Sequence, residues 1–173
     1  MKREALLDAA ESVLQEHGSQ ALTLTAVAER AGVSKGGLLY HFPTKDALVT
    51  ALIARVIAEF DELIAEHADE GSYTRGFVEA TFAILAAPSG ERTTRRWAAI
   101  TAAATTPELR APLHEAMRRW HRRDTAVEHE HDPVTAAVVR LAAEGLWEVA
   151  AQDPGGYSAE EFTALRRRML DLL

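Results

Sequence analysis

The sequence has 173 residues, enough for one domain with a buried core or for a small module joined to a larger one. It contains no cysteine, which excludes disulfides, thiolate nucleophiles and cysteine-ligated zinc. The formal net charge of −7, taken alone, argues against a nucleic acid partner. Affinity for a polyanion depends on the charge at the docking face, however, so the acidic excess can lie elsewhere in the chain.

The start of the chain, Met1 to Leu7, lacks the apolar core of a signal peptide, and no apolar stretch is long enough to cross a membrane. We therefore expect a cytoplasmic protein with no membrane partner. Apolar residues recur at helical spacing nearly everywhere, alanine is abundant, and no stretch alternates with period two. This pattern predicts an all-α fold of about nine helices.

Capping and breaking residues delimit the predicted N-terminal helices. Three hydroxyl side chains precede helical stretches and can accept hydrogen bonds from the free amides of the next turn: Thr23, Ser34 and Thr44. Three residues end such stretches: Gly18, Gly32 and Pro43. These signals predict helices from Lys2 to His17, from Thr23 to Gly32, from Ser34 to about Phe42, and a long fourth helix from Thr44 onward.

Turn residues divide the rest of the chain into five further helices. The predicted ranges are 73–86, 91–104, 108–128, 134–152 and 159–172. We expect a division into two domains, 1–46 and 47–173, with the long fourth helix as the mechanical link between them.

Two short helices joined by a glycine turn, in the N-terminal stretch, have the form that inserts into a DNA major groove. Six apolar residues are predicted to pack these helices together: Val27, Ala28, Ala31, Val33, Leu38 and Phe42. Lys35 has the reach to contact a guanine edge or a phosphate, and Gly36 and Gly37 allow the backbone to approach the bases. The residues expected to contact DNA are Thr23, Thr25, Ser34, Lys35, Gly36, Gly37, Leu39, Tyr40, His41, Thr44 and Lys45. The alternative is a purely structural helix-turn-helix with a solvated polar face.

Residues 23–34 read TLTAVAERAGVS, and residues 34–48 read SKGGLLYHFPTKDAL. In order, spacing and capping residues this stretch closely resembles the TetR family of repressors. The resemblance implies a homodimer that binds a pseudo-palindromic operator on double-stranded DNA. Carried over by position, it places Thr25, Lys35, Gly36 and Gly37 nearest the bases, and Tyr40, His41, Thr44 and Lys45 nearest phosphates. Only Lys2 and Arg3 precede the first helix, so a basic arm in the minor groove is not expected.

In the resembled family, the region corresponding to 47–173 binds a small-molecule inducer and forms the dimer. The candidates to line a pocket here are Phe60, Phe77, Phe82, Trp97, Met117, Trp120 and Trp147. Such side chains suit an apolar, aromatic or cationic inducer, and acidic residues such as Glu79, Glu144 and Glu148 can pair with a cation if they face inward. The alternative is that the aromatic residues only fill a core.

The last two predicted helices resemble the dimerisation pair of the family. Their apolar residues include Val138, Val139, Leu146, Val149, Phe162, Leu165, Met169 and Leu172. Ala142, Ala143 and Gly145 would permit close helix approach, although the same residues can instead seal the core of one subunit. The histidines at 114, 121, 129 and 131 show no spacing typical of a metal site, so we expect no metal and no cofactor.

The combined interpretation is a ligand-responsive repressor, released from its operator by an inducer, with an efflux or transport gene as a target by analogy. One alternative is a helix-turn-helix regulator controlled by a protein partner. The other is an enzyme that uses the aromatic cavity, although the sequence has no nucleophile elbow, no phosphate-binding glycine loop and no metal-ligand set.

Overall fold

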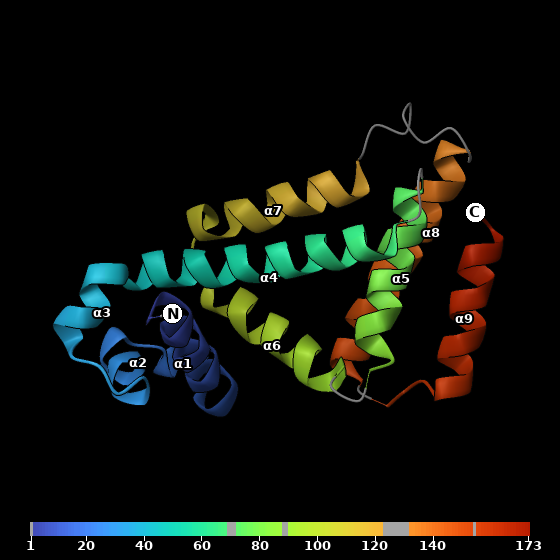
Figure 1. Ribbon diagram of the computed structural model, residues 1–173. Helices are drawn as coiled ribbons and strands as arrows, with labels where there is room; N and C mark the ends of the chain where they lie inside the picture. The colour runs from blue at the N-terminus through green and yellow to red at the C-terminus, as the bar shows by residue number, and fades with distance from the viewer. Residues whose placement is uncertain (1, 69–71, 88–89, 123–131, 154) are drawn as a thin grey trace. The chain divides into compact units, whose positions relative to one another are not determined.

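A computed structural model describes residues 2–68, 72–87, 90–122, 132–153 and 155–173 (Figure 1). Over these ranges the chain forms helices only, which confirms the predicted all-α fold. The helices are α1 (Lys2–His17), a 3-10 turn η1 (Ser19–Ala21), α2 (Leu24–Arg30), α3 (Lys35–His41), α4 (Lys45–His67), α5 (Tyr73–Leu85), α6 (Gly90–Ala103), α7 (Pro107–His121), α8 (Pro133–Gln152) and α9 (Ala159–Asp171).

The predicted helix ends are confirmed where a local cap sets them. The hydroxyls of Thr23, Ser34 and Thr44 accept hydrogen bonds from backbone amides three residues later, at 3.1, 3.1 and 3.0 Å. Gly32 has a φ of 65°, the left-handed conformation that the turn after α2 requires. The predicted helix 108–128 ends at His121, and its remainder from residue 123 lies outside the described residues, as do His129 and His131.

The chain forms two compact units. The N-terminal unit comprises Met1–Ile57 and Arg95–Glu115, and the C-terminal unit comprises Ala58–Thr94 and Ala116–Leu173. Their boundaries fall inside α4, α6 and α7, so three helices belong partly to each unit. The predicted boundary between a DNA-binding domain, 1–46, and a ligand-binding domain, 47–173, stays a prediction. The packing divides the chain at other positions.

One hydrophobic core holds the N-terminal unit together. Apolar faces of α1, α2, α3 and the first half of α4 meet in it, and they include the buried side chains of Leu6, Val27 and Leu38. The end of α6 and the start of α7 also enter this core, through Ile100, Ala103, Ala104 and Leu109. Val33 is 37% exposed, so the prediction that it packs the two short helices together is wrong, because Val33 lies in the turn and not on either helix.

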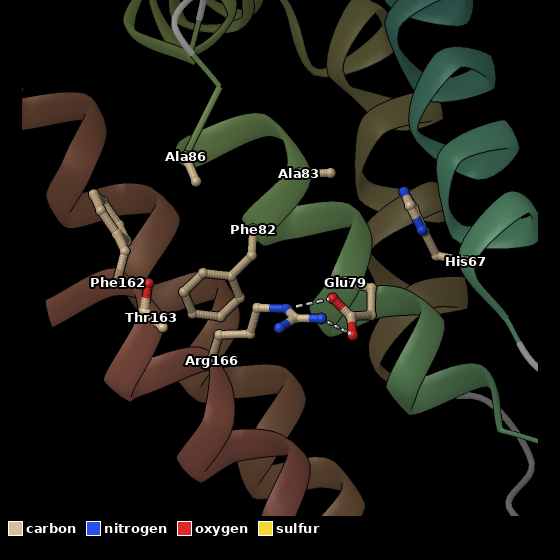
Figure 2. Close-up of a pocket in the computed structure, with 8 residues that line it drawn as sticks. All are labelled: His67, Glu79, Phe82, Ala83, Ala86, Phe162, Thr163 and Arg166. Atoms are coloured by element: carbon tan, nitrogen blue, oxygen red, sulfur yellow. Dashed lines mark hydrogen bonds and ion pairs between the residues drawn. The ribbon is translucent and has the colours of Figure 1, made fainter. Parts of the chain in front are cut away.

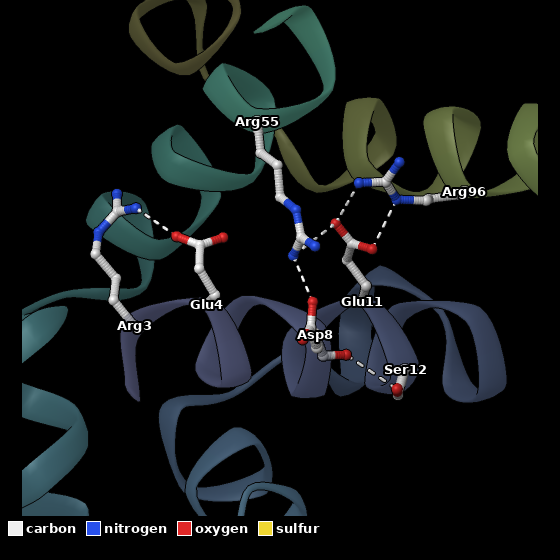
Figure 3. Close-up of polar contacts among 7 residues, drawn as sticks. All are labelled: Arg3, Glu4, Asp8, Glu11, Ser12, Arg55 and Arg96. Carbon is white, nitrogen blue, oxygen red and sulfur yellow. Dashed lines mark hydrogen bonds and ion pairs between the residues drawn. The ribbon is translucent and has the colours of Figure 1, made fainter. Parts of the chain in front are cut away.

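Ion pairs join α1 to α4 and α6 within this unit (Figure 3). Arg96 of α6 donates from Nε and Nη2 to the two carboxylate oxygens of Glu11, at 2.6 and 2.7 Å. Both side chains are largely buried, with 15% and 12% of their surface exposed. Arg55 of α4 pairs with Asp8 at 2.6 Å and lies 3.7 Å from Glu11. Sequence positions 85 residues apart are therefore linked by a bidentate, charge-assisted pair.

Helix α5 is the central element of the C-terminal unit, where it packs against both α8 and α9. Eight of its residues are buried: Thr74, Gly76, Phe77, Val78, Ala80, Thr81, Phe82 and Ile84. Ser158 caps the start of helix α9: its hydroxyl accepts from the Glu161 amide, while the Glu161 carboxylate accepts from the Ser158 amide. The hydrogen bonds that the Glu161 carboxylate accepts from the amide and the hydroxyl of Ser158 hold the pKa of Glu161 below its ordinary value.

We expect Glu11→Gln to lower the free energy of unfolding by about 1.5–3 kcal/mol, because Arg96 would lose its charged partner in a largely buried position. Glu4→Gln is the matched control on the same helix. Glu4 is 56% exposed and lies 3.4 Å from Arg3, so its loss should change stability by at most about 1 kcal/mol. Thermal and urea denaturation measure both values, and equal effects of the two substitutions would contradict the importance of the α1–α6 pair.

Candidate functional site

The residues predicted to contact DNA lie together on α2, α3 and the start of α4. Ten of the eleven are exposed, and His41 is half-buried. Tyr40 is 85% exposed, an unusual position for a large aromatic side chain that packs against no core. Leu39 is also exposed, whereas its neighbour Leu38 is fully buried. Helix α3 therefore keeps one apolar side for the core and presents the other to solvent.

The three capping hydroxyls on this surface can serve a second purpose. Each accepts a backbone amide hydrogen at the start of its helix, and this leaves its own hydrogen free to be donated outward. A phosphate oxygen is a suitable acceptor for such a hydroxyl. Thr23, Ser34 and Thr44 thus combine a structural role inside the unit with a hydroxyl that is able to donate to a phosphate, and their contact with DNA stays a prediction.

The two glycines of α3 differ in what surrounds them. A side-chain carbon at Gly36 would meet nothing within 4 Å, whereas one at Gly37 would lie 3.3 Å from the capping Oγ of Ser34. Alanine at position 36 would favour the helix by up to about 1 kcal/mol. No contact among the described residues of the unit therefore requires glycine at position 36, and the close approach of DNA to the backbone there stays a prediction.

The charges divide unevenly between the two units. The N-terminal unit contains nine Lys and Arg residues against eight Asp and Glu residues, whereas the C-terminal unit contains ten against eighteen. The acidic excess of the chain therefore belongs to the C-terminal unit. The low net charge of the N-terminal unit removes the objection that the overall acidity raised against a polyanionic partner.

Four of the seven residues predicted to bind a ligand form an aromatic cluster in the C-terminal unit. The Phe60 ring makes edge contacts with those of Phe77, Trp120 and Trp147, at centroid distances of 5.5, 5.0 and 6.2 Å. Phe60, Phe77 and Trp120 are buried, and Nε1 of Trp120 donates to Asp61 at 2.7 Å. These residues fill a core in this structure, and their contact with a ligand stays a prediction.

A pocket of about 210 Å³ lies between α5, which carries Phe77 of the cluster, and α9 (Figure 2). It is lined by His67, Glu79, Phe82, Ala83, Ala86, Phe162, Thr163 and Arg166. Phe82 is the one residue of the predicted ligand set that lines it. The Arg166 guanidinium donates to both carboxylate oxygens of Glu79 at 2.6 and 2.5 Å, and this hydrogen bonding raises the pKa of Arg166 above its ordinary value. The pocket thus has apolar walls and one internally compensated ion pair.

The other two predicted ligand residues lie apart from these features. Trp97 packs against the core of the N-terminal unit, whereas the aromatic cluster belongs to the C-terminal unit. Met117 is half-buried on α7. Within the described ranges, no group of three histidine or acidic residues is placed to hold a metal ion, and no helix is long and apolar enough to span a membrane.

Two family models match the chain along most of its length. Residues 6–52 match the bacterial regulatory proteins of the tetR family, and residues 71–173 match the tetracyclin repressor-like C-terminal domain. The chain belongs to the TetR family of transcriptional regulators. The resemblance drawn from residues 23–48 is confirmed, and the helix-turn-helix is that of a DNA-binding regulator.

Of two individual relatives of this TetR-family regulator, one is similar in part of its sequence and one is similar in its whole fold. It is 41% identical over 56 residues to the HTH-type transcriptional regulator RutR of Escherichia coli (strain K12), a match that covers 32% of this chain and 26% of RutR. The chain therefore spans about a quarter of the length of this curated relative. A transcriptional regulator from Rhodococcus sp. Rha1 has the same fold over 100% of this chain and 96% of its own, with 25% identity and a TM-score of 0.78.

A third likeness shows the fold alone. The multidrug binding protein EbrR, solved in complex with malachite green, is 22% identical and has a TM-score of 0.74, with 99% of this chain and 97% of EbrR covered. The TetR-family architecture therefore extends over both units, including the helices for which the sequence pattern gave only approximate lengths.

Two buried polar features of this TetR-family protein were missed by sequence reasoning. The pairing of Glu11 with Arg96 leaves no local signal, because the two residues belong to different predicted domains. Arg140 did leave a signal, since it stands alone in the apolar run from Ala136 to Ala143, and the structure buries it to 1% exposure. An unpaired charge in the apolar stripe of a helix should be treated as a candidate site residue.

We expect Gly36→Ala to raise the free energy of unfolding by up to about 1 kcal/mol and, at the same time, to weaken operator binding about tenfold or more. The two effects have opposite directions, so reduced folding cannot explain the lost affinity. Thermal denaturation and fluorescence anisotropy with an operator duplex measure them separately. Unchanged affinity would show that α3 does not bring its backbone close to the bases.

Proposed function

We propose that this protein is a ligand-responsive repressor that binds a pseudo-palindromic operator as a homodimer and is released by a small-molecule inducer. The observation that carries the proposal is the exposed start of α3. There Lys35 is followed by Gly36, which has open space around it, and the capping hydroxyl of Ser34 has a hydrogen to donate. This combination is suited to the major groove, because a lysine and a glycine backbone can reach base edges while hydroxyls hold phosphates.

An exposed apolar stripe on α8 supports the homodimer. Val134, Val138, Leu141 and Val149 are 68, 54, 60 and 46% exposed and recur at helical spacing on one face. Gly145 lies on the same face with open space around it, so a second helix can approach closely. Val139, Leu146 and Ala143, which the sequence also offered for dimerisation, are buried inside their own unit instead. A continuous stripe of this kind is what a self-complementary helix pairing requires.

Two features of the C-terminal unit support ligand binding. One is the pocket beside Phe82, and the other is the aromatic cluster around Phe60, whose edge-to-face contacts can rearrange around a flat molecule. EbrR, which shares the fold, was solved with malachite green bound. We infer that the inducer is a small molecule with an apolar or aromatic body and that it binds within the C-terminal unit.

Release of DNA requires that the inducer favour one shape of the protein over another. Helices α4, α6 and α7 each begin in one unit and continue into the other, so a shift of their segments in the C-terminal unit is carried along the helix. We infer that such a shift changes the spacing of the two α3 helices in the dimer. A coupling of about 1–3 kcal/mol would change operator affinity about 5- to 150-fold.

Selection of binding duplexes from a random library, at physiological salt, tests the proposal directly. The expected product is an inverted repeat whose halves lie about one turn of DNA apart. A library of small molecules then tests the release of that duplex. A selection that yields no inverted repeat would overturn the proposal, and an operator complex that only a protein partner dissociates would favour the alternative of regulation by protein contact.

Two lysines should affect this complex differently. We expect Lys45→Ala to weaken binding to every sequence and to lower the salt dependence by about 1.8 in log–log slope per dimer, because each phosphate contact contributes about 0.9. Lys35→Ala should in addition change which bases are preferred. Anisotropy titrations over a range of salt and a set of operator variants distinguish them, and equal effects of both substitutions would contradict this assignment.

Charge on the α8 stripe should abolish the dimer. We expect Leu141→Asp to give a monomer with unchanged helix content, because the pairing would bury a carboxylate without a partner. Ala98→Asp, at an exposed position of α6 in the N-terminal unit, is the matched control and should stay dimeric. Analytical ultracentrifugation reports the state of both variants, and a dimeric Leu141→Asp protein would place the interface elsewhere.

A further inference from the structure

The largest fully buried side chain in the described chain is that of an arginine. Arg140, on α8, is 1% exposed. Its two terminal nitrogens donate to Thr74 Oγ1 at 2.5 Å and to the His121 backbone oxygen at 3.3 Å. Both acceptors are uncharged. The guanidinium therefore holds a full positive charge in the interior of the C-terminal unit, with a hydroxyl and a carbonyl as its hydrogen-bond partners.

Three nitrogen atoms around this charge lack hydrogen-bond partners among the residues that the structure describes. They are Nε of Arg140 and both ring nitrogens of His121. Nε2 of His121 lies 3.7 Å from Glu144, which is beyond hydrogen-bond distance. A buried N–H group without an acceptor is unfavourable, and a buried cation without an anion is more so. These three nitrogens belong to two residues that are themselves joined by a hydrogen bond.

Helix capping alone explains this arrangement poorly. Arg140 reaches the last carbonyl of α7, and the negative end of that helix gives partial compensation for its charge. A guanidinium has five N–H donors, however, and the described contacts use two of its three nitrogens while leaving Nε unused. A capping role also leaves the two unpartnered nitrogens of His121 without an explanation.

We propose that Arg140 and His121 form the anchor for an anionic inducer, an aromatic or apolar molecule that carries a carboxylate. This inference rests on the proposed ligand response and names the chemical class of the ligand. A carboxylate accepts in-plane hydrogen bonds from a guanidinium and can accept another from an imidazole N–H. The Phe77 ring, in edge contact with His121 at 5.5 Å and with Phe60 at 5.5 Å, leads from this anchor to the aromatic cluster. The cluster provides the apolar contacts for the body of the ligand.

This assignment differs from the cationic inducer that the acidic residues suggested. Glu79 is compensated by Arg166, and Glu144 lies near His121, while the buried charge in need of a partner is positive. Arg140 is closed to solvent, so the ligand enters only when α5, α7 and α8 separate locally. Because α7 continues into the N-terminal unit, this opening acts on a helix that the two units share.

The test uses the dimer of the 173-residue chain and three probes of similar size: 1-naphthoate, its neutral amide and the cationic 1-naphthylmethylammonium, with benzoate as a smaller anion. Isothermal titration calorimetry at constant ionic strength should show the carboxylate bound about 10- to 100-fold more tightly than the amide or the cation. Arg140→Met should remove this preference. A wild-type protein that shows no preference for the carboxylate, or an Arg140→Met protein that keeps this preference, would overturn the proposal.

The melting temperature without ligand separates this role from a structural one. Arg140→Met removes an incompletely partnered buried charge and keeps the side-chain volume, so it should leave the melting temperature unchanged or raise it. A purely structural arginine predicts a marked decrease instead. Should Arg140→Met fold poorly, Thr74→Val tests the same site, since it removes the Oγ1 acceptor and should change carboxylate affinity more than amide affinity; equal changes would count against the anchor.

Operator binding without any probe is measured in parallel. A wild-type protein that binds its operator but does not prefer the carboxylate would overturn this inference alone. A protein that prefers the carboxylate but selects no operator would overturn the proposed repressor function and leave the anion anchor standing.

Discussion

The packing of α6 and α7 into the core of the helix-turn-helix unit is the constraint on which the rest of the structure depends. Ile100 and Leu109 are buried in the same core as Leu6 and Leu38, and the bidentate pair of Arg96 with Glu11 fixes α6 to α1. The buried apolar contacts are close-packed and the largely buried ion pair is directional. A displacement of one of these helices therefore also displaces the helices packed against it. Helices α2 and α3, which are predicted to contact DNA, therefore share one core with the two helices that continue into the C-terminal unit.

The distribution of charge follows from the same division. A unit with nearly balanced charge can come close to phosphates, whereas the acidic C-terminal unit is better suited to solubility than to DNA contact. On the proposed DNA-binding surface, Lys35 and Lys45 would need to neutralise only the few phosphates within their reach. Global acidity in a DNA-binding protein is therefore no contradiction, provided that the acidic residues belong to the part that does not contact the duplex.

The sequence predicted best what is decided locally. Thr23, Ser34 and Thr44 cap helices through hydrogen bonds to amides three residues away, and Gly32 turns the chain by its own φ, so helix ends and the helix-turn-helix could be derived without tertiary contacts. What depends on contacts between distant segments could not be derived. Trp97 was placed in the ligand set by its size alone, although packing assigns it to the core of the N-terminal unit. The stripe on α8 was only half predicted, because periodicity shows that a helix has apolar sides but not which side its own unit buries.

The buried charge at Arg140 has a consequence for how a switch of this kind can work. A ligand shifts an equilibrium only by the difference in its affinity for the two states. In a core whose polar groups all have hydrogen-bond partners already, an entering anion would gain few new hydrogen bonds. A guanidinium held with neutral acceptors, beside an imidazole that has no hydrogen bond to any described residue, gives the anion-bound state interactions that the ligand-free state lacks. Incomplete satisfaction of this cluster is therefore a source of differential affinity, and its position between α5, α7 and α8 makes the anion-bound state differ in shape as well as in charge.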